Sequence, residues 1–273
     1  MAPDSVVDHQ LNLVTQDVLT WGSWGLTFVV LGVAIQMGRR ERTPFYVLMV
    51  FAAGLGAFAE PIYDILMALH FYSTDGMFTH YTSFDVAQPV WTHSGYVVLY
   101  ASAAMGISRL MSKGMLTRNK LFAFAGIEVV MSCVFEIYGT SMDGYTYWGP
   151  HVFRIFEYPI VCGVLEAAQV ITFALAAAVL RKHATQTWHL LGLLVVFPCT
   201  FFLVNVGAGW PTMVGLHLED TSRTIVTIGT LMSFGLAAAV VRLAGAMLPY
   251  AVLTPAPVPA STESEPREER TLV

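Results

Sequence analysis

Seven long runs of apolar residues, separated by short polar segments, dominate the sequence. They cover residues 18–37, 44–72, 91–111, 121–141, 159–180, 188–206 and 224–248. A helix needs about 20 mainly apolar residues to cross the hydrocarbon layer of a bilayer, and each run reaches or approaches that length. The pattern therefore predicts an all-α fold, a polytopic membrane bundle of about seven transmembrane helices within residues 18–250.

The second run and the two ends of the chain depart from this pattern. Pro61 directly follows Glu60 in a run longer than one span needs, which predicts a tilt or a local break there. Residues 1–17 are polar and acidic, unlike a cleaved signal peptide, so we expect an extracytoplasmic segment and a retained first helix. Residues 251–273 are rich in Pro, Ser, Thr and Glu, which predicts a disordered tail.

Composition supports a lipid bilayer as the environment. The chain is 55% hydrophobic and 12% charged, whereas soluble globular chains carry about 25% charged residues. The net charge of −5 includes several tail glutamates, and no basic patch indicates a nucleic-acid partner. Cys133, Cys162 and Cys199 lie inside apolar runs without C-x-x-C spacing, which is typical of core residues.

The distribution of basic residues predicts the orientation. Of the 14 Lys and Arg residues, only Arg154 and Arg223 fall on one side of the predicted bundle. The other twelve fall on the opposite side: Arg39, Arg40, Arg42, Arg109, Lys113, Arg118, Lys120, Arg181, Lys182, Arg242, Arg267 and Arg270. The positive-inside rule then places the amino terminus outside and the carboxyl tail in the cytoplasm of a multi-pass cell-membrane protein.

Acidic residues inside or beside the apolar runs are the most informative feature. Ionisable groups at membrane depth are costly enough to indicate a functional site. These acidic residues are Glu60, Asp64, Glu128, Glu136, Glu157 and Glu166. The predicted orientation places every one of them except Glu128 in the outer half of the bundle.

The spacing of these acids suggests acid chemistry. Glu60 and Asp64 share one helix face, and together with Tyr63 they are expected to line a cavity. Desolvation and like-charge repulsion favour the neutral acid, so the cluster predicts a Brønsted acid that keeps its proton near neutral pH. The alternative is that hydrogen bonds to Tyr, Ser or backbone neutralise these groups and join helices.

His93, in the run WTHSGY, suits a proton relay, a metal ligand or an ordinary interfacial histidine. A metal site of His93 with Glu60, Asp64, Glu136 and Glu166 would offer oxygen and nitrogen ligands. Since no H-E-x-x-H or E-x-x-H spacing is present, we expect no metal and no cofactor.

Aromatic residues fall into two groups. Trp21, Trp24, Trp91 and Trp188 lie at the ends of apolar runs, as in an aromatic belt at the membrane surface. A second group is expected to face the acids, where aromatic ring faces would stabilise a carbocation: Tyr63, Tyr138, Tyr145, Tyr147, Trp148 and Trp210.

Missing motifs narrow the chemistry. Runs such as D-D-x-x-D, which ionise a prenyl diphosphate through magnesium, are absent, as are G-x-S-x-G, the Walker lysine loop and a dinucleotide fingerprint. The last apolar run contains no lysine, which excludes a retinal Schiff base of the rhodopsin type.

The stretch GAFAEPIYD resembles the N-F-A-W-E-x-x-Y pattern of the small seven-helix membrane terpene cyclases of meroterpenoid pathways. The resemblance implies proton handling by Glu60 and an aromatic role for Tyr63. That family also uses an aspartate near its late helices, where this chain has Asn205 and, in a loop, Glu219 and Asp220. Glu136 or Glu166 would have to supply the second acid.

A second stretch, FEIYGTSMDGYTYWG, resembles the E-x-x-G-x-x-x-G-x-Y-x-Y pattern of membrane carotenoid hydratases. That family protonates an isoprenoid double bond and adds water. Both resemblances imply acid-initiated chemistry on a hydrophobic terpenoid or prenylated molecule, with cyclisation as our prediction and hydration as the close variant.

These arguments give two sets of candidate residues. The expected catalytic residues are Glu60, Asp64, Glu136 and Glu166, and the expected substrate-binding residues are Tyr63, His93, Tyr138, Tyr147, Trp148 and Glu157. A proton-coupled transporter or lipid-handling protein is the main alternative, because intramembrane carboxylates also serve proton relays. A non-catalytic sensor that binds through its outer loops is the third.

A topology reporter fused after Val273 tests the orientation. We expect activity only in the cytoplasm, because the basic residues gather on the side of the carboxyl tail. The same reporter inserted after Asp85, in a predicted outer loop, should give the opposite signal. Extracytoplasmic activity after Val273 would reverse both assignments.

Overall fold

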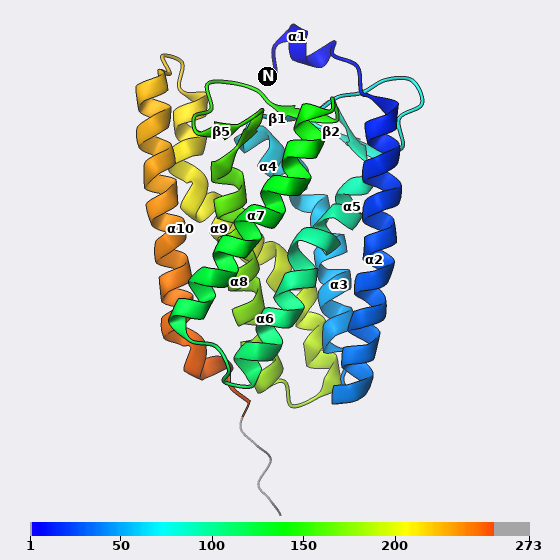
Figure 1. The fold of residues 1–273 in the computed structure, drawn as a ribbon, viewed down its shortest axis with the longest axis vertical. Helices are drawn as coiled ribbons and strands as arrows, with labels where there is room; N and C mark the ends of the chain where they lie inside the picture. The colour runs from blue at the N-terminus through cyan, green and yellow to red at the C-terminus, as the bar shows by residue number, and fades with distance from the viewer. Residues whose placement is uncertain (1, 254–273) are drawn as a thin grey trace, which may run out of the picture.

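Long helices running up and down form most of the computed structural model, which describes residues 2–253 (Figure 1). The chain begins with the short helix α1 (Asp4–Val7). The longer helices that follow are α2 (Leu13–Glu41), α3 (Phe45–Gly56), α4 (Glu60–Leu66), α5 (Trp91–Tyr96), α6 (Ser102–Ser112), α7 (Arg118–Ser141), α8 (Ile160–His183), α9 (Leu193–His217) and α10 (Arg223–Ala251).

Six helical stretches within residues 2–253 are long and apolar enough to cross a membrane: Leu13–Glu41, Phe45–Leu66, Arg118–Ser141, Ile160–His183, Thr187–His217 and Arg223–Ala251. The 3-10 turn η3 (Thr187–Gly192) leads into α9. The predicted run 91–111 is also helical, but it consists of α5, a π-helical turn η2 (Val97–Ala101) and α6. The mainly helical bundle is thus confirmed, while the first long helix, α2, begins at Leu13 rather than at residue 18.

Side-chain caps fix where several helices start. Asn12 accepts from the backbone N–H of Val14 at 3.0 Å before α2, and Ser222 accepts from Ile225 N–H at 3.3 Å before α10. Thr117 does the same for Lys120 before α7. Each cap satisfies a backbone donor that the first helical turn leaves free.

The predicted local break in the second run is present. Helix α3 ends at Gly56, the 3-10 turn η1 (Ala57–Ala59) follows, and α4 starts at Glu60 with Pro61 in its first turn. Proline is tolerated there because its missing N–H has no intrahelical acceptor. The break makes Glu60 the first residue of a new helix, and this helix ends at Leu66 rather than near residue 72.

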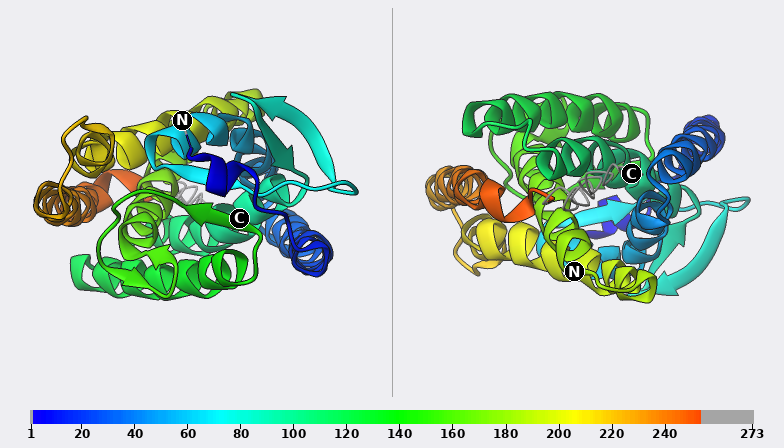
Figure 2. Two further views of the ribbon diagram at one scale, coloured as in Figure 1. Left: turned by 90° about the horizontal axis from the view of Figure 1, so that it is seen from above. Right: turned by 90° about the horizontal axis from the view of Figure 1, so that it is seen from below.

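Three small antiparallel ribbons cover the end of the bundle where the amino terminus lies, which we call the loop end (Figures 1 and 2). They pair β1 (Leu69–Phe71) with β4 (Tyr145–Tyr147), β2 (Thr79–Ser83) with β3 (Val86–Pro89), and β5 (Arg154–Ile155) with β6 (Tyr158–Pro159). The all-α prediction missed them. In the first ribbon Leu69 lies opposite Tyr147 and Phe71 opposite Tyr145, so alternate residues of both strands turn their side chains inward.

An ion-pair network ties four helices together at the opposite end, which we call the basic end. The carboxylate of Glu41, the last residue of α2, lies 2.6 Å from Arg109 of α6 and 2.9 Å from Arg181 of α8. Tyr46 of α3 donates a hydrogen bond to Glu41 at 2.7 Å, and the Arg181 guanidinium lies over the ring of Phe45. Charged groups with several partners in a shared network hold their geometry better than isolated surface pairs.

Small residues let α9 and α10 approach closely. Pro211 lies inside α9, and a Cβ on Gly229 of α10 would collide with its carbonyl oxygen. Beside this contact the backbone N–H of Thr212 donates to Ser233 Oγ at 3.3 Å. The Ser233 side chain of α10 therefore satisfies a backbone N–H of α9 next to the proline that interrupts that helix.

A matched pair of glycine substitutions on α10 tests this packing. Gly229→Ala should lower stability by about 1–3 kcal/mol, because the collision involves backbone that cannot rotate away. Gly235→Ala should be neutral or stabilise by up to about 1 kcal/mol, since its Cβ meets open space and alanine favours a helix. The measurement is the thermal unfolding midpoint in detergent, and equal midpoints would contradict the α9–α10 contact.

Candidate functional site

A small enclosed cavity lies below the loop end, bounded by α4, α5, α7, α8 and the β1–β4 ribbon. Its free space is about 40 Å³, room for a few water molecules. Carboxyl and aromatic side chains predominate in its walls: Glu60, Tyr63, Leu69, Phe71, Trp91, Thr92, Gly95, Tyr96, Leu99, Tyr100, Phe135, Glu136, Tyr145, Tyr147 and Glu166. We call this space the acid cavity.

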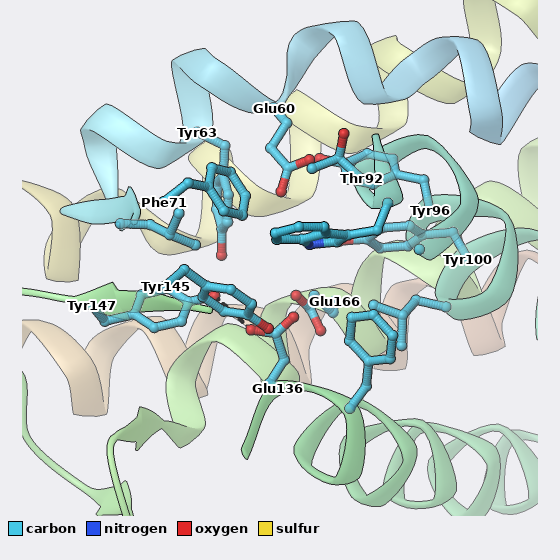
Figure 3. A pocket seen from close by; sticks show the side chains of 15 residues that line it. Glu60, Tyr63, Phe71, Thr92, Tyr96, Tyr100, Glu136, Tyr145, Tyr147 and Glu166 are labelled. Atoms are coloured by element: carbon cyan, nitrogen blue, oxygen red, sulfur yellow. Dashed lines mark hydrogen bonds between the residues drawn. The ribbon is translucent and has the colours of Figure 1, made fainter. Parts of the chain in front are cut away.

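Three carboxyl groups face the acid cavity from three helices (Figure 3). Glu60 extends from the first turn of α4 on one wall, and Glu136 of α7 and Glu166 of α8 extend from the opposite wall. Among the described lining residues there is no Lys, Arg or His. An ionised carboxylate buried without a counter-ion is very costly, so this environment favours neutral carboxylic acids.

The three carboxyl groups differ in their hydrogen-bond partners. Tyr147 donates to Glu136 at 3.0 Å, and Ser132 donates to Glu166. By contrast, Glu60 Oε2 and the Tyr63 hydroxyl are buried without a hydrogen-bond partner among residues 2–253. Of the three carboxyl groups that line the cavity, Glu60 is therefore the one with a buried, unpartnered oxygen, whereas Glu136 and Glu166 each accept a hydrogen bond.

Aromatic rings hold one another in fixed positions around these acids. Phe71 meets Trp91 edge to face at 6.2 Å and Tyr145 at 5.5 Å, and Tyr96 lies 4.9 Å from Tyr100. Edge-to-face contacts are favourable beyond the area they bury. The rings also present electron-rich faces that can stabilise a cation.

Helix α5 and the π-helical turn η2 supply one complete wall. Thr92, Tyr96 and Leu99 follow one another at the spacing of a single helical face, and Tyr100 comes from the π turn itself. Single π turns inside helices often occur at functional sites. The turn brings both Leu99 and Tyr100 into the wall beside Glu166.

The structure brings five of the predicted site residues together and separates the others. Glu60, Tyr63, Glu136, Tyr147 and Glu166 line the acid cavity. Asp64 is buried one turn further along α4, outside the lining, with both carboxyl oxygens unpartnered among the described residues.

The remaining predicted residues lie elsewhere. Glu157 is exposed and pairs with Arg154 at 3.4 Å. Trp148 packs edge to face against His217, and Tyr138 is half-buried outside the lining. His93 lines a different cavity on the other face of α5. These four residues do not touch the acid cavity.

Sequence reasoning missed several lining residues. Trp91 was assigned to the membrane-surface belt, but it is 2% exposed and lines the acid cavity, so that assignment was wrong. Tyr96 and Tyr100 could have been found, because two residues four apart in one apolar run lie on the same face of a helix. Ser132 and Tyr158, whose hydroxyl oxygens lie 2.9 Å apart, are outside the lining, but Ser132 holds Glu166. The sequence carried no signal for this pair, since the contact joins separate segments of the chain.

Within the described part of the chain, no group of three or more His, Cys, Asp or Glu side chains is placed to hold a metal ion. A comparison with protein-family models finds no family that matches the chain, and comparisons with curated proteins and with solved structures find no match either.

His151 gives the loop end a measurable pH response. Its Nε2 lies 2.9 Å from the Met67 carbonyl, and its ring packs against Tyr147 of the acid cavity. Burial, together with the charge of Arg154, lowers the pKa of His151 from 6.5 to about 4. The unfolded chain therefore binds a proton more readily than the folded one between these values.

We expect the stability contributed by this group to be complete above pH 6.5 and to fall as the pH drops towards 4, by up to about 3 kcal/mol. Thermal unfolding in detergent across this range measures it. His151→Gln, whose amide nitrogen can take the position of Nε2 as donor to the Met67 carbonyl but does not titrate, should flatten the dependence. An equally steep curve in the variant would assign the pH response to other groups.

Proposed function

We propose that the chain is a multi-pass membrane protein with seven crossings, its loop end outside and its basic end in the cytoplasm. Six apolar helices of sufficient length support this, and the α5–η2–α6 segment supplies the seventh crossing. The turns after α2, α6 and α8, which hold most of the basic residues, all lie at the basic end (Figure 1).

We further propose that it is an enzyme that protonates a carbon–carbon double bond of an apolar, isoprenoid-type substrate, and that cyclisation follows. The observation that carries this proposal is the meeting of three carboxyl groups, without a described cation, inside a wall of aromatic rings. Neutral acids supply the proton, and ring faces stabilise the carbocation that protonation creates.

Glu60 is the proposed acid because, of the three carboxyl groups that line the cavity, it is the one with a buried oxygen that has no hydrogen-bond partner among the described residues. Its proton adds to one alkene carbon, and the π electrons form the new C–H bond and leave a carbocation on the other carbon. A second double bond of the substrate attacks this cation and closes a ring. Loss of a proton from the final cation to a carboxylate restores the acid, and capture by water instead gives the hydratase variant.

The size of the acid cavity sets a requirement on this reaction. A free space of about 40 Å³ is far below the roughly 300–1,000 Å³ of sites for drug-sized ligands, so the cavity has to widen to admit a terpenoid. A narrow cleft lined by Glu128, Ser132 and Ala167 adjoins it and shares Leu99 and Tyr100 with it. We propose that widening begins there, between η2 and α7.

The same small volume favours a second candidate function, a proton relay in a proton-coupled transporter. Carboxyl groups that exchange protons need no room for an organic substrate. The two candidates separate experimentally, because an enzyme turns over in detergent, whereas coupled transport needs a sealed membrane and a gradient.

Glu60→Gln tests the enzymatic proposal. The amide keeps the shape of the side chain but has no transferable proton, and loss of a general acid costs about 100- to 10,000-fold in rate. Products are measured by mass spectrometry of lipid extracts from a host fed prenylated substrates, with the purified protein assayed in detergent. Because we expect a metal-independent reaction, EDTA should leave wild-type turnover unchanged.

Glu157→Gln is the matched control, since the same change is made at an exposed carboxylate outside the cavity. Both variants should keep the wild-type unfolding temperature, because a neutral amide is no harder to bury than a neutral acid. Near-normal turnover of a folded Glu60→Gln protein would remove Glu60 from the mechanism. Activity lost together with folding would assign Glu60 a structural role.

A further inference from the structure

A second, larger cavity lies on the other face of α5. Its volume is about 490 Å³, within the range of sites that hold drug-sized ligands. Residues at helical spacing from three helices form it: Trp24, Thr27, Phe28 and Leu31 of α2, Val50, Gly54 and Leu55 of α3, and Val97 after α5. The hairpin residue His80 of β2 also lines it. We call it the α2–α3 cavity.

Trp24 and His93, whose side chains both line the cavity, each carry a buried polar atom without a hydrogen-bond partner among the described residues. His93 Nδ1 lies 2.7 Å from the Gly54 carbonyl. A carbonyl oxygen only accepts, so Nδ1 carries the proton and Nε2 of the neutral ring is an acceptor. His93 Nε2 has no hydrogen-bond partner among the described residues, and neither has Trp24 Nε1, which only donates.

Such unpaired atoms are uncommon in folded proteins, because each costs about 1–3 kcal/mol when it is buried away from water. Both belong to side chains that line the same cavity. An occupant that pairs with them must be apolar over most of its length and must carry a group that accepts and donates. An alcohol or phenol meets both conditions and brings no charge into the apolar site.

We propose that the α2–α3 cavity binds a lipid-soluble alcohol or phenol, whose hydroxyl oxygen accepts from Trp24 and whose hydroxyl proton is donated to His93. The rim of the cavity includes Phe28, Phe51 and Leu55, which are all exposed on the outer surface of the bundle. A ligand dissolved in the hydrocarbon layer therefore enters sideways without crossing water. This binding is independent of the chemistry proposed for the acid cavity.

Three probes with the same carbon skeleton test the hydrogen bonds one at a time. Farnesol donates and accepts, farnesyl methyl ether only accepts, and farnesene does neither. Each competes for photolabelling of the protein in lipid nanodiscs by a diazirine analogue of farnesol, and labelled peptides should come from α2 and α3. We expect farnesol to compete at about tenfold lower concentration than the ether, and the ether at about tenfold lower than farnesene.

Two variants should change this series in different ways. His93→Asn can keep the donor to the Gly54 carbonyl but has no acceptor at the position of Nε2, so farnesol and its methyl ether should compete equally. Trp24→Phe loses the donor, so farnesol and its methyl ether should each compete about tenfold more weakly, while competition by farnesene should be unchanged. A purely structural effect would weaken all three probes together.

Trp21→Phe is the matched control, because Trp21 lies on the same helix and does not line this cavity. Glu60→Gln should also leave the series unchanged, which separates this site from the acid cavity. Equal competition by all three probes, or labelling away from α2 and α3, would overturn the proposal. Tighter competition by oleic acid than by farnesol would overturn the assignment of the ligand as an alcohol or phenol.

Discussion

Burying three carboxyl groups in one apolar interior is the constraint on which the loop end depends. No described cation lines the cavity, so neutral hydroxyl donors must hold the acids. Tyr147 supplies one from β4, and Ser132 supplies another from α7. The strand β4 is held by its pairing with β1 and by a hydrogen bond from Arg154 to the Tyr147 carbonyl. The small ribbons that look peripheral in Figure 1 therefore support the hydrogen bonds of the interior.

Helix α5 has a double role because it is the wall between two unlike cavities. Thr92 and Tyr96 face the acid cavity, while His93 and Val97 face the apolar one. The helix is only six residues long and continues into a π-helical turn, so it is joined to α6 by backbone of altered pitch. A ligand in either cavity would press on α5 from one side. Two cavities with different linings thus share one short helix.

The sequence predicts those features that depend on local pattern. Apolar runs near 20 residues become the long helices, and Pro61 marks the break that puts Glu60 at a helix start. Glu136 and Glu166 stand out because an acid at membrane depth is costly. The strands and the His93 placement depend instead on contacts between distant segments. Neighbours such as Thr92 and His93 enter different cavities, and only the packing of α2 and α3 decides which.

The Glu41 network holds four helices together at one end of the bundle. It fastens α2, α3, α6 and α8 at the basic end, far from the acid cavity at the loop end. A helix of 24 residues such as α8 is about 36 Å long, so a tilt of about 5° around the fastened end displaces its far end by about 3 Å. A small tilt of a helix about the basic end would therefore open space between helices at the loop end.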